Sequence, residues 1–124
     1  MSYVDGFVIA VPSGNKEEFV VHARTFDEMI LAEGALRVVE CWGDDVSRGK
    51  ITDFYGAVQA TDGETVCFSW VEWPDKATRD AAHARMQKKM ESGEIPSGTT
   101  DMPFDGKRMI FGGFAPVLEL GGKA

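Results

Sequence analysis

The stretch that most constrains the fold is TVCFSWVEW at residues 65–73, which Pro74 ends. Valine, threonine, phenylalanine and tryptophan dominate it, and such β-branched and aromatic residues favour β-strands. The side chains of a strand point alternately to its two faces, and both faces of this one carry large apolar groups. Such a strand belongs in a sheet that is covered on both sides.

Around this strand the chain alternates between strand-like and helix-like segments. Residues 15–33 carry apolar side chains at helical spacing, and residues 75–91 have helical composition with alanines that allow close approach to a sheet. Asn15 and Glu18 make a capping-box-like start for the first helix, and Gly34 is suited to end it. We also expect three further strands at residues 3–11, 35–42 and 107–120, an extended segment at 51–60 and irregular chain at 92–106.

This order of elements predicts an α+β domain over residues 1–124 with a ferredoxin-like, split βαβ topology, in which one antiparallel sheet carries both helices on one face. The other face then has no cover within the chain, although the strands are apolar on that side too. An exposed apolar sheet face is a surface for a partner. We therefore predict a homodimer through this open face, with the two sheets facing each other.

Composition narrows the choice of partners. The chain has 124 residues and a formal net charge of −7, which disfavours nucleic acid because binding to phosphates depends largely on Lys and Arg. No apolar stretch reaches the length of a membrane span, and the first residues have the pattern of a folded strand rather than a signal peptide. We expect a cytoplasmic protein without a membrane partner, with reduced thiols at Cys41 and Cys67.

Several long motifs are similar to those of one family. They are VVECWGDDV, FSWVEWP, RDAA and MPFDGKRMIFGGF, within a similarity that runs from YVDGFVIAVP to GGFAPVLEL and covers nearly the whole chain. In these motifs the chain resembles the YbaA-like family of small bacterial proteins of unknown function. That family belongs to the dimeric α/β-barrel superfamily, so the resemblance implies the same fold and a dimer, but it supplies no reaction.

Glutamates inside apolar strands are the first candidates for chemistry. Alternation puts Glu40 and Trp42 on one face of their strand, and Trp70 and Glu72 on one face of the next. We expect these two faces to coincide, so that the four side chains form one wall. The opposite wall would then carry Cys41, Cys67 and Ser69.

A carboxylate on an apolar wall needs either an ion partner or a wet cavity in front of it. In the functional interpretation, Glu40 and Glu72 face a cavity, and one of them has a raised pKa and acts as a general base. In the structural interpretation, they form buried ion pairs that fix the register of the dimer. Arg108 or Arg79 is then the expected partner of Glu40.

The segment MPFDGKRM brings an aromatic, an acid and two cations to the start of the last strand. A long irregular segment in a compact domain is often a binding loop, and its Lys-Arg pair could receive an anionic group. Alternatively, Asp105 pairs with Arg108 across the turn and the segment is a dimer arm. The candidate ligand-binding residues are Trp42, Trp70, Phe104, Asp105 and Arg108.

Other polar residues are weaker candidates. Cys41 has no base nearby in the strand pattern, and Ser69 lacks the Gly-x-Ser-x-Gly elbow of a nucleophile. His22 and His83 stand alone on predicted helices, which does not make a haem or metal site. Acidic turn residues normally accept backbone hydrogen bonds, and this describes Asp44, Asp45 and Asp53. We expect no metal and no cofactor.

Two functions of different classes remain open, and the sequence does not decide whether the protein is an enzyme. The first is a domain that binds or transforms a small, partly apolar, anionic metabolite. The second is a non-catalytic homodimeric module for interaction or regulation. A cavity of roughly 300 Å³ or more that holds a carboxylate favours the first, and a filled, dry sheet face favours the second.

Overall fold

The computed structural model describes residues 2–94 and 102–122 of the chain, and it confirms the predicted fold. Two short 3₁₀ turns, η1 (Ser13–Asn15) and η2 (Gly106–Arg108), accompany the main elements. These elements are β1 (Tyr3–Pro12), α1 (Lys16–Ala32), β2 (Arg37–Trp42), α2 (Phe54–Ala57), β3 (Glu64–Trp73), α3 (Lys76–Glu91) and β4 (Ile110–Phe114).

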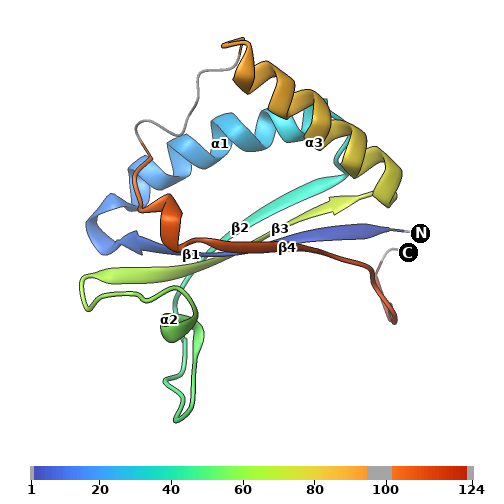
Figure 1. Ribbon diagram of the computed structural model, residues 1–124. Helices are drawn as coiled ribbons and strands as arrows, with labels where there is room; N and C mark the ends of the chain where they lie inside the picture. The colour runs from blue at the N-terminus through green and yellow to red at the C-terminus, as the bar shows by residue number, and fades with distance from the viewer. Residues whose placement is uncertain (1, 95–101, 123–124) are drawn as a thin grey trace.

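The strands form one sheet in the order β2-β3-β1-β4, and every neighbouring pair is antiparallel. β1 and β2 therefore run parallel but are separated by β3, which is the split βαβ arrangement. Helices α1 and α3 lie together over one face of the sheet, and the connection that contains α2 lies on the other side (Figure 1). No helix in the described part of the chain is long and apolar enough to cross a membrane.

Local sequence explains where the helices begin and end. The Asp75 carboxylate accepts a hydrogen bond from the backbone N–H of Thr78 at 2.7 Å and so caps the start of α3. Gly34, with φ of 120°, follows the end of α1 in a conformation that other residues rarely adopt. The expected capping box of α1 is wrong, because Asn15 instead donates from Nδ2 to the carbonyl oxygen of Pro103 at 3.1 Å.

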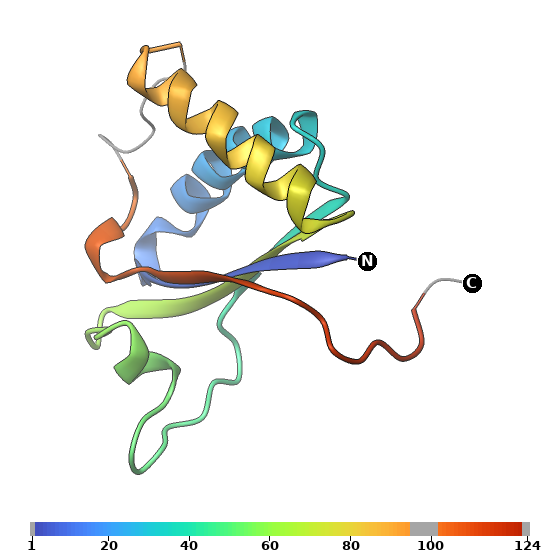
Figure 2. The same ribbon diagram turned by 45° about the vertical axis from the view of Figure 1, so that its right-hand side comes forward.

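Two other expectations about local structure are also wrong. Residues 54–57 form a short helix within the segment expected to be extended, because the Asp53 carboxylate accepts a hydrogen bond from the N–H of Gly56 at 2.6 Å. The last strand ends at Phe114 rather than at residue 120, since β1 offers pairing partners only to residues 110–114. Beyond that point the chain runs away from the sheet (Figure 2). Part of the predicted irregular segment, 95–101, lies outside the described residues.

The core fills the space between the sheet and the helices. Val71, Trp73 and the fully buried Ala82 of α3 form one cluster, where the small alanine lets the helix approach the sheet closely, as its composition predicted. A second cluster lies under α1 and contains Ile9, Val11, Phe19 and Cys67. We call this side of the sheet the helix face. A third, smaller cluster lies on the opposite side, where Val58 packs on Ala10 and Val66.

The opposite side of the sheet is the open face, because α1 and α3 both lie on the other side (Figure 1). It carries a hollow of about 460 Å³, and the residues that line this hollow are apolar or glycine. The ring of Phe114 lies over Gly6 and Gly112, where an added Cβ would come within 3.6 Å of it. The outward side chains of this hollow are Val4, Val8, Phe68, Trp70, Ile110 and Phe114, with Gly6 and Gly112 between them.

Candidate functional site

A cavity of about 310 Å³ lies between the helix face of the sheet and the two helices. Most of its wall is apolar, and segments far apart in the sequence contribute to it. Its polar lining residues are His22 and Asp27 from α1, Glu40 from β2 and Ser69 from β3. The apolar lining residues are Phe7, Ile9, Phe19, Ala23, Phe26, Ile30, Val71, Met90, Met102, Phe104 and Met109.

Asp27 and Glu40 form a pair of carboxyl groups in this cavity. Asp27 lies on α1 and Glu40 on the edge strand β2, close enough for a hydrogen bond between them. Burial, with the hydrogen bond and the negative charge of Glu40, raises the pKa of Asp27 to about 8. Two carboxyls side by side in apolar surroundings do not both ionise, so Asp27 keeps its proton at neutral pH. The pair thus offers a proton donor and a carboxylate side by side.

His22 adds a neutral imidazole to the same wall. Burial lowers the pKa of His22, and the nearby Glu40 carboxylate opposes this only in part. Its ring lies 5.2 Å from that of Phe26 and 5.7 Å from that of Phe104, between centroids. His22 therefore contributes no positive charge to the cavity at neutral pH.

Ser69 is the fourth polar group of the cavity wall. The residue is 2% exposed, and its hydroxyl has no hydrogen-bond partner among the described residues. Ser69 is also the direct partner of Glu40 in the pairing of β2 with β3, so both side chains point to the helix face. A buried hydroxyl without a partner costs free energy and often marks the place of a missing ligand or water.

The expected common wall of Glu40, Trp42, Trp70 and Glu72 is wrong. In the observed register Glu40 lies opposite Ser69, and Val39 lies opposite Trp70, which is a shift of one residue from the expected sorting. Because side chains alternate, this shift places Glu40 and Trp42 on the helix face and Trp70 and Glu72 on the open face. Glu40 consequently shares its face with Cys67 and Ser69.

Glu72 and the two tryptophans have structural partners. The indole Nε1 of Trp70 donates a hydrogen bond to Glu72 at 2.9 Å, and Arg37 lies 3.6 Å from the same carboxylate oxygen. Trp42 packs against Phe19 with ring centroids 6.0 Å apart, and the ammonium of Lys16 lies 5.7 Å from the Trp42 ring. Neither tryptophan lines the cavity, nor does Glu72.

The expected ligand-binding segment near residue 105 divides into two parts. Phe104 lines the cavity and packs edge-on against Phe19 at 6.0 Å. Arg108, in contrast, is occupied by acids: its guanidinium contacts Glu64 at 2.6 and 2.7 Å and Asp105 at 3.1 Å. These contacts lower the pKa of Glu64 to about 2, with Arg108 as the main cause. The alternative in which Asp105 pairs with Arg108 is therefore the one observed.

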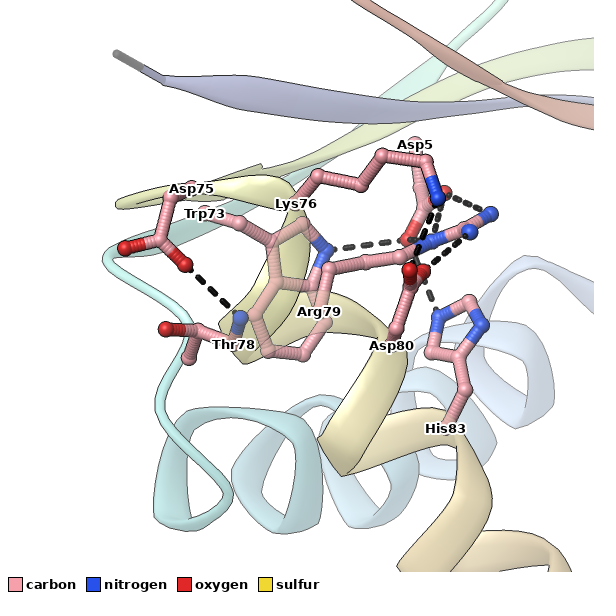
Figure 3. A network of polar contacts seen from close by, with 8 residues as sticks. All are labelled: Asp5, Trp73, Asp75, Lys76, Thr78, Arg79, Asp80 and His83. Carbon is pink, nitrogen blue, oxygen red and sulfur yellow. Dashed lines mark hydrogen bonds and ion pairs between the residues drawn. The ribbon is translucent and has the colours of Figure 1, made fainter.

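Arg79, the other expected partner of Glu40, binds a different carboxylate. Its Nη2 and Nε lie 2.9 and 3.0 Å from Oδ1 of Asp5, which is almost fully buried on β1. Asp5 also accepts a hydrogen bond from the indole of Trp73 and contacts His83 Nε2 at 3.0 Å (Figure 3). This network joins α3 to the sheet, and it leaves Glu40 without a cationic partner among the described residues.

The weaker candidates have ordinary structural roles. Cys41 and Cys67 point to opposite faces of the sheet and are free thiols, and burial raises the pKa of Cys67 to about 11. Asp53 caps α2, as noted above. Within residues 2–94 and 102–122, no group of three or more His, Cys, Asp or Glu side chains could hold a metal ion.

Sequence reasoning missed Asp27 and set Ser69 aside. Asp27 follows Ala23 by four positions and precedes Ile30 by three, so helical spacing places it on the buried stripe of α1. An acid in that stripe was the available signal. Ser69 gave no comparable signal, because its importance depends on the register that places it opposite Glu40.

Fold and cavity together define a small α+β protein of ferredoxin-like topology, with an apolar cavity that holds a pair of carboxyl groups. The family described as "Protein of unknown function (DUF1428)" matches residues 2–106. The chain belongs to this family, which confirms the predicted resemblance. It is 48% identical over 119 residues to the uncharacterized protein YbaA of Escherichia coli strain K12 and of Shigella flexneri, an alignment that covers 96% of this chain and 99% of each relative.

A solved structure has a similar fold. It is a dimeric ferredoxin-like protein from an uncultured marine organism, with a TM-score of 0.59 and 12% sequence identity. The alignment covers 96% of this chain and 98% of that chain. At such low identity the likeness concerns the fold alone.

Proposed function

We propose that this protein binds a small, largely apolar molecule in the cavity between its sheet and its helices. The observation that carries the proposal is the combination of about 310 Å³ of space, an apolar wall and the polar groups Asp27, Glu40 and Ser69. Small-molecule sites typically occupy roughly 300–1,000 Å³ and combine apolar walls with a few convergent polar groups. A module that serves only for interaction has no need of such a cavity.

The carboxyl pair suits acid–base chemistry on the bound molecule. A protonated Asp27 can donate to one atom of a ligand while Glu40 accepts a proton from another. Of the two glutamates expected to act in catalysis, Glu40 keeps that role in the proposal, and Asp27 takes the place of Glu72. We do not expect the ligand to carry an anionic group, because Arg108, the expected partner of such a group, is already paired with Glu64 and Asp105.

Homodimerisation through the open face is the second part of the proposal. Phe68 and Phe114 line the hollow on this face and are 44% and 61% exposed, and an exposed apolar patch of this kind marks a surface for a partner. The similar fold of a dimeric ferredoxin-like protein supports the same kind of assembly. A second copy would cover the hollow of about 460 Å³ on this face.

Binding of a neutral hydrophobic dye, N-phenyl-1-naphthylamine, tests the cavity. The dye fluoresces more strongly in apolar surroundings, and we expect saturable binding to the wild type. Ala23→Met, which adds volume to the cavity wall, should weaken this binding, while Phe68→Ser on the open face should leave it unchanged. Binding that is lost in Phe68→Ser and kept in Ala23→Met would place the dye in the open-face hollow and contradict the proposal.

A further inference from the structure

Three oxygen-bearing side chains converge in the cavity from three separate elements. Asp27 comes from α1, Glu40 from β2 and Ser69 from β3. Glu40 and Ser69 are direct partners across the two strands, and Asp27 lies within hydrogen-bonding reach of Glu40. The Ser69 hydroxyl is buried and has no partner among the described residues, although it lines the cavity. This unpartnered hydroxyl is an observation separate from the two acids, and it also indicates that a ligand binds in the cavity.

Within residues 2–94 and 102–122, the cavity wall carries negative charge that no positive charge on the same wall balances. Among the described residues, the titratable members of the wall are His22, Asp27 and Glu40, whereas the described lining residues from β1, β3, α3 and residues 102–109 are uncharged. His22 is neutral at neutral pH, as is the thiol of Cys67 near Glu40. Arg79 and Arg108, the arginines expected as partners of Glu40, are bound to other acids. In the part of the chain that the structure describes, the cavity thus holds negative charge without a cation of its own, and the net charge of −7 attracts cations from solution.

The apolar part of the wall is rich in aromatic rings. Four phenylalanines line the cavity, together with three methionines that can adapt to the shape of a ligand. Aromatic faces attract cations, and they also provide the apolar surface that the body of a small molecule needs. The four rings are those of Phe7, Phe19, Phe26 and Phe104.

We propose that the cavity binds a primary organic ammonium ion with an apolar body. This inference rests on the proposed function and specifies the ligand of the same cavity. An ammonium group has three N–H donors and no acceptor. Asp27, Glu40 and Ser69 offer three acceptors from different directions, and the phenylalanines enclose the apolar body. A metal ion fits less well, because no group of three or more His, Cys, Asp or Glu side chains in the described part of the chain could hold one.

Binding of the ammonium ion releases the proton held between the carboxyl groups. In the empty cavity Asp27 is protonated, because burial disfavours its charged form and the adjacent Glu40 carboxylate repels a second negative charge. A cation between the two carboxyl groups stabilises the charged form of Asp27, so Asp27 gives its proton to solvent as the ligand enters. The affinity for an amine therefore rises with pH up to about pH 8, where Asp27 ionises without a ligand.

Competition for the bound dye among three matched compounds tests the proposal. The compounds are 2-phenylethylamine, the neutral 2-phenylethanol and the anionic 3-phenylpropanoate, which share a phenyl ring and differ in the charge of the polar end. At pH 8 we expect the amine to displace N-phenyl-1-naphthylamine at concentrations about tenfold lower than the alcohol. The carboxylate should be weaker than both. Calorimetry in buffers of different ionisation enthalpy at pH 7 should show that a proton is released on amine binding.

Single substitutions identify the groups involved. Glu40→Gln should weaken amine binding about tenfold and reduce proton release, while binding of the alcohol changes less than about twofold. Ser69→Ala should weaken amine binding about threefold. The matched control is Glu28→Gln, which removes the next acid on α1, outside the cavity wall, and should change nothing.

The possible failures are distinguishable. If the dye binds in the cavity but the amine is no better a competitor than the alcohol, the ammonium inference is wrong and the proposed function stands. The ammonium inference is also wrong, and the proposed function again stands, if amine binding does not depend on Glu40. If the dye does not bind in the cavity at all, the proposed function itself is contradicted.

Discussion

The indole Nε1 of Trp73 donates a hydrogen bond to Oδ2 of Asp5 at 2.9 Å, and both residues are almost completely buried between the sheet and α3. The same carboxylate holds the guanidinium of Arg79 and contacts His83, as Figure 3 shows. Asp5 is thus the point at which β1, β3 and α3 are joined by polar contacts. Removing this carboxylate would leave the mostly buried Arg79 with Asp80 as its remaining acid partner, and the indole N–H of Trp73 without a partner.

We therefore expect Asp5→Ala to lower the free energy of unfolding by about 3–5 kcal/mol, the usual cost of leaving one partner of a buried ion pair alone. Asp5→Asn should cost less, because its amide oxygen can still accept from Trp73. Lys76→Ala breaks the exposed pair between Lys76 and Asp80 and is the control, with an expected change within about 0.5 kcal/mol. Urea unfolding at one fixed protomer concentration measures all three, and equal effects of Asp5→Ala and Lys76→Ala would contradict this role of Asp5.

The ion pair of Glu64 with Arg108 predicts a loss of stability in acid. Arg108 and a backbone N–H lower the pKa of Glu64 from 4.5 to about 2, so the folded state stabilises the charged form. That contribution is complete above pH 4.5 and disappears as the pH falls toward 2. Glu64→Gln should thus lower the free energy of unfolding at pH 7 by about 1.5–3 kcal/mol, the range for hydrogen bonds to charged groups.

The free energy of unfolding of the wild type and of Glu64→Gln, measured at a series of pH values, checks this predicted loss of stability in acid. The difference between the two proteins should shrink steadily as the pH falls from about 4.5 to about 2. Asp62→Asn, a nearby exposed acid, should follow the wild type throughout. A difference that stays constant with pH would show that the ion pair is not its source.

Asp27 predicts a pH dependence of the opposite sign. Its pKa is raised from 3.8 to about 8 in the folded state, which therefore holds a proton that the unfolded chain releases in this interval. Stability contributed by this proton is complete below pH 3.8 and is lost as the pH rises to about 8. Asp27→Asn, which cannot ionise, should lack this decline, whereas Glu28→Gln should retain it. Carboxyl ¹³C NMR of Asp27 measures the pKa directly, and a value near 4 would rule out the effect.

The sequence predicted the order of strands and helices because β3 is rich in β-branched and aromatic residues and α1 has a clear helical spacing of apolar residues. It did not predict the register between β2 and β3. Both faces of β3 are apolar, with Phe68 and Trp70 on one and Val71 and Trp73 on the other, so alternation alone does not reveal which face meets the helices. The inward face is set by the pairing, which places Glu40 opposite Ser69.

The candidate site followed from the sequence only in part, for the same reason. Glu40 and Phe104 were expected and do line the cavity, whereas Asp27 becomes a partner of Glu40 only when α1 is laid on the sheet. Arg108 was expected to face a ligand, yet its partner Glu64 lies 44 residues away along the chain, at the start of β3. Contacts of such sequence separation depend on the three-dimensional arrangement, which local patterns do not specify.

Ser69 predicts a case in which loss of a polar group increases stability. Its buried hydroxyl has no partner among the described residues, so the folded state bears the cost of removing it from water. Ser69→Ala should raise the free energy of unfolding by about 1 kcal/mol while it weakens amine binding as described above. Ser13→Ala removes a hydroxyl bonded to Thr65 at 2.8 Å and is the control, with no expected gain. A clear loss of stability in Ser69→Ala would mean that the hydroxyl already has a partner in the unliganded protein.

The open face predicts that one charge is enough to separate the protomers. Phe68 projects from the middle of the sheet between Phe54 and Trp70, with ring centroids 6.1 and 5.8 Å away, and would be buried between two facing sheets. Phe68→Lys places an ammonium in that apolar interface, where burial without a partner costs several kcal/mol. Sedimentation equilibrium at micromolar concentration should therefore show a dimer for the wild type and a monomer for this variant.

Leu31→Lys provides the matched control, because Leu31 on α1 is 45% exposed and Phe68 is 44% exposed, so both substitutions replace an equally accessible apolar side chain. Leu31 lies on the opposite side of the molecule from the open face, and its variant should remain a dimer. Circular dichroism should be the same for both variants, since neither side chain belongs to the buried core. A wild-type monomer, or a Phe68→Lys variant that still forms dimers, would show that the open sheet face is not where two copies meet.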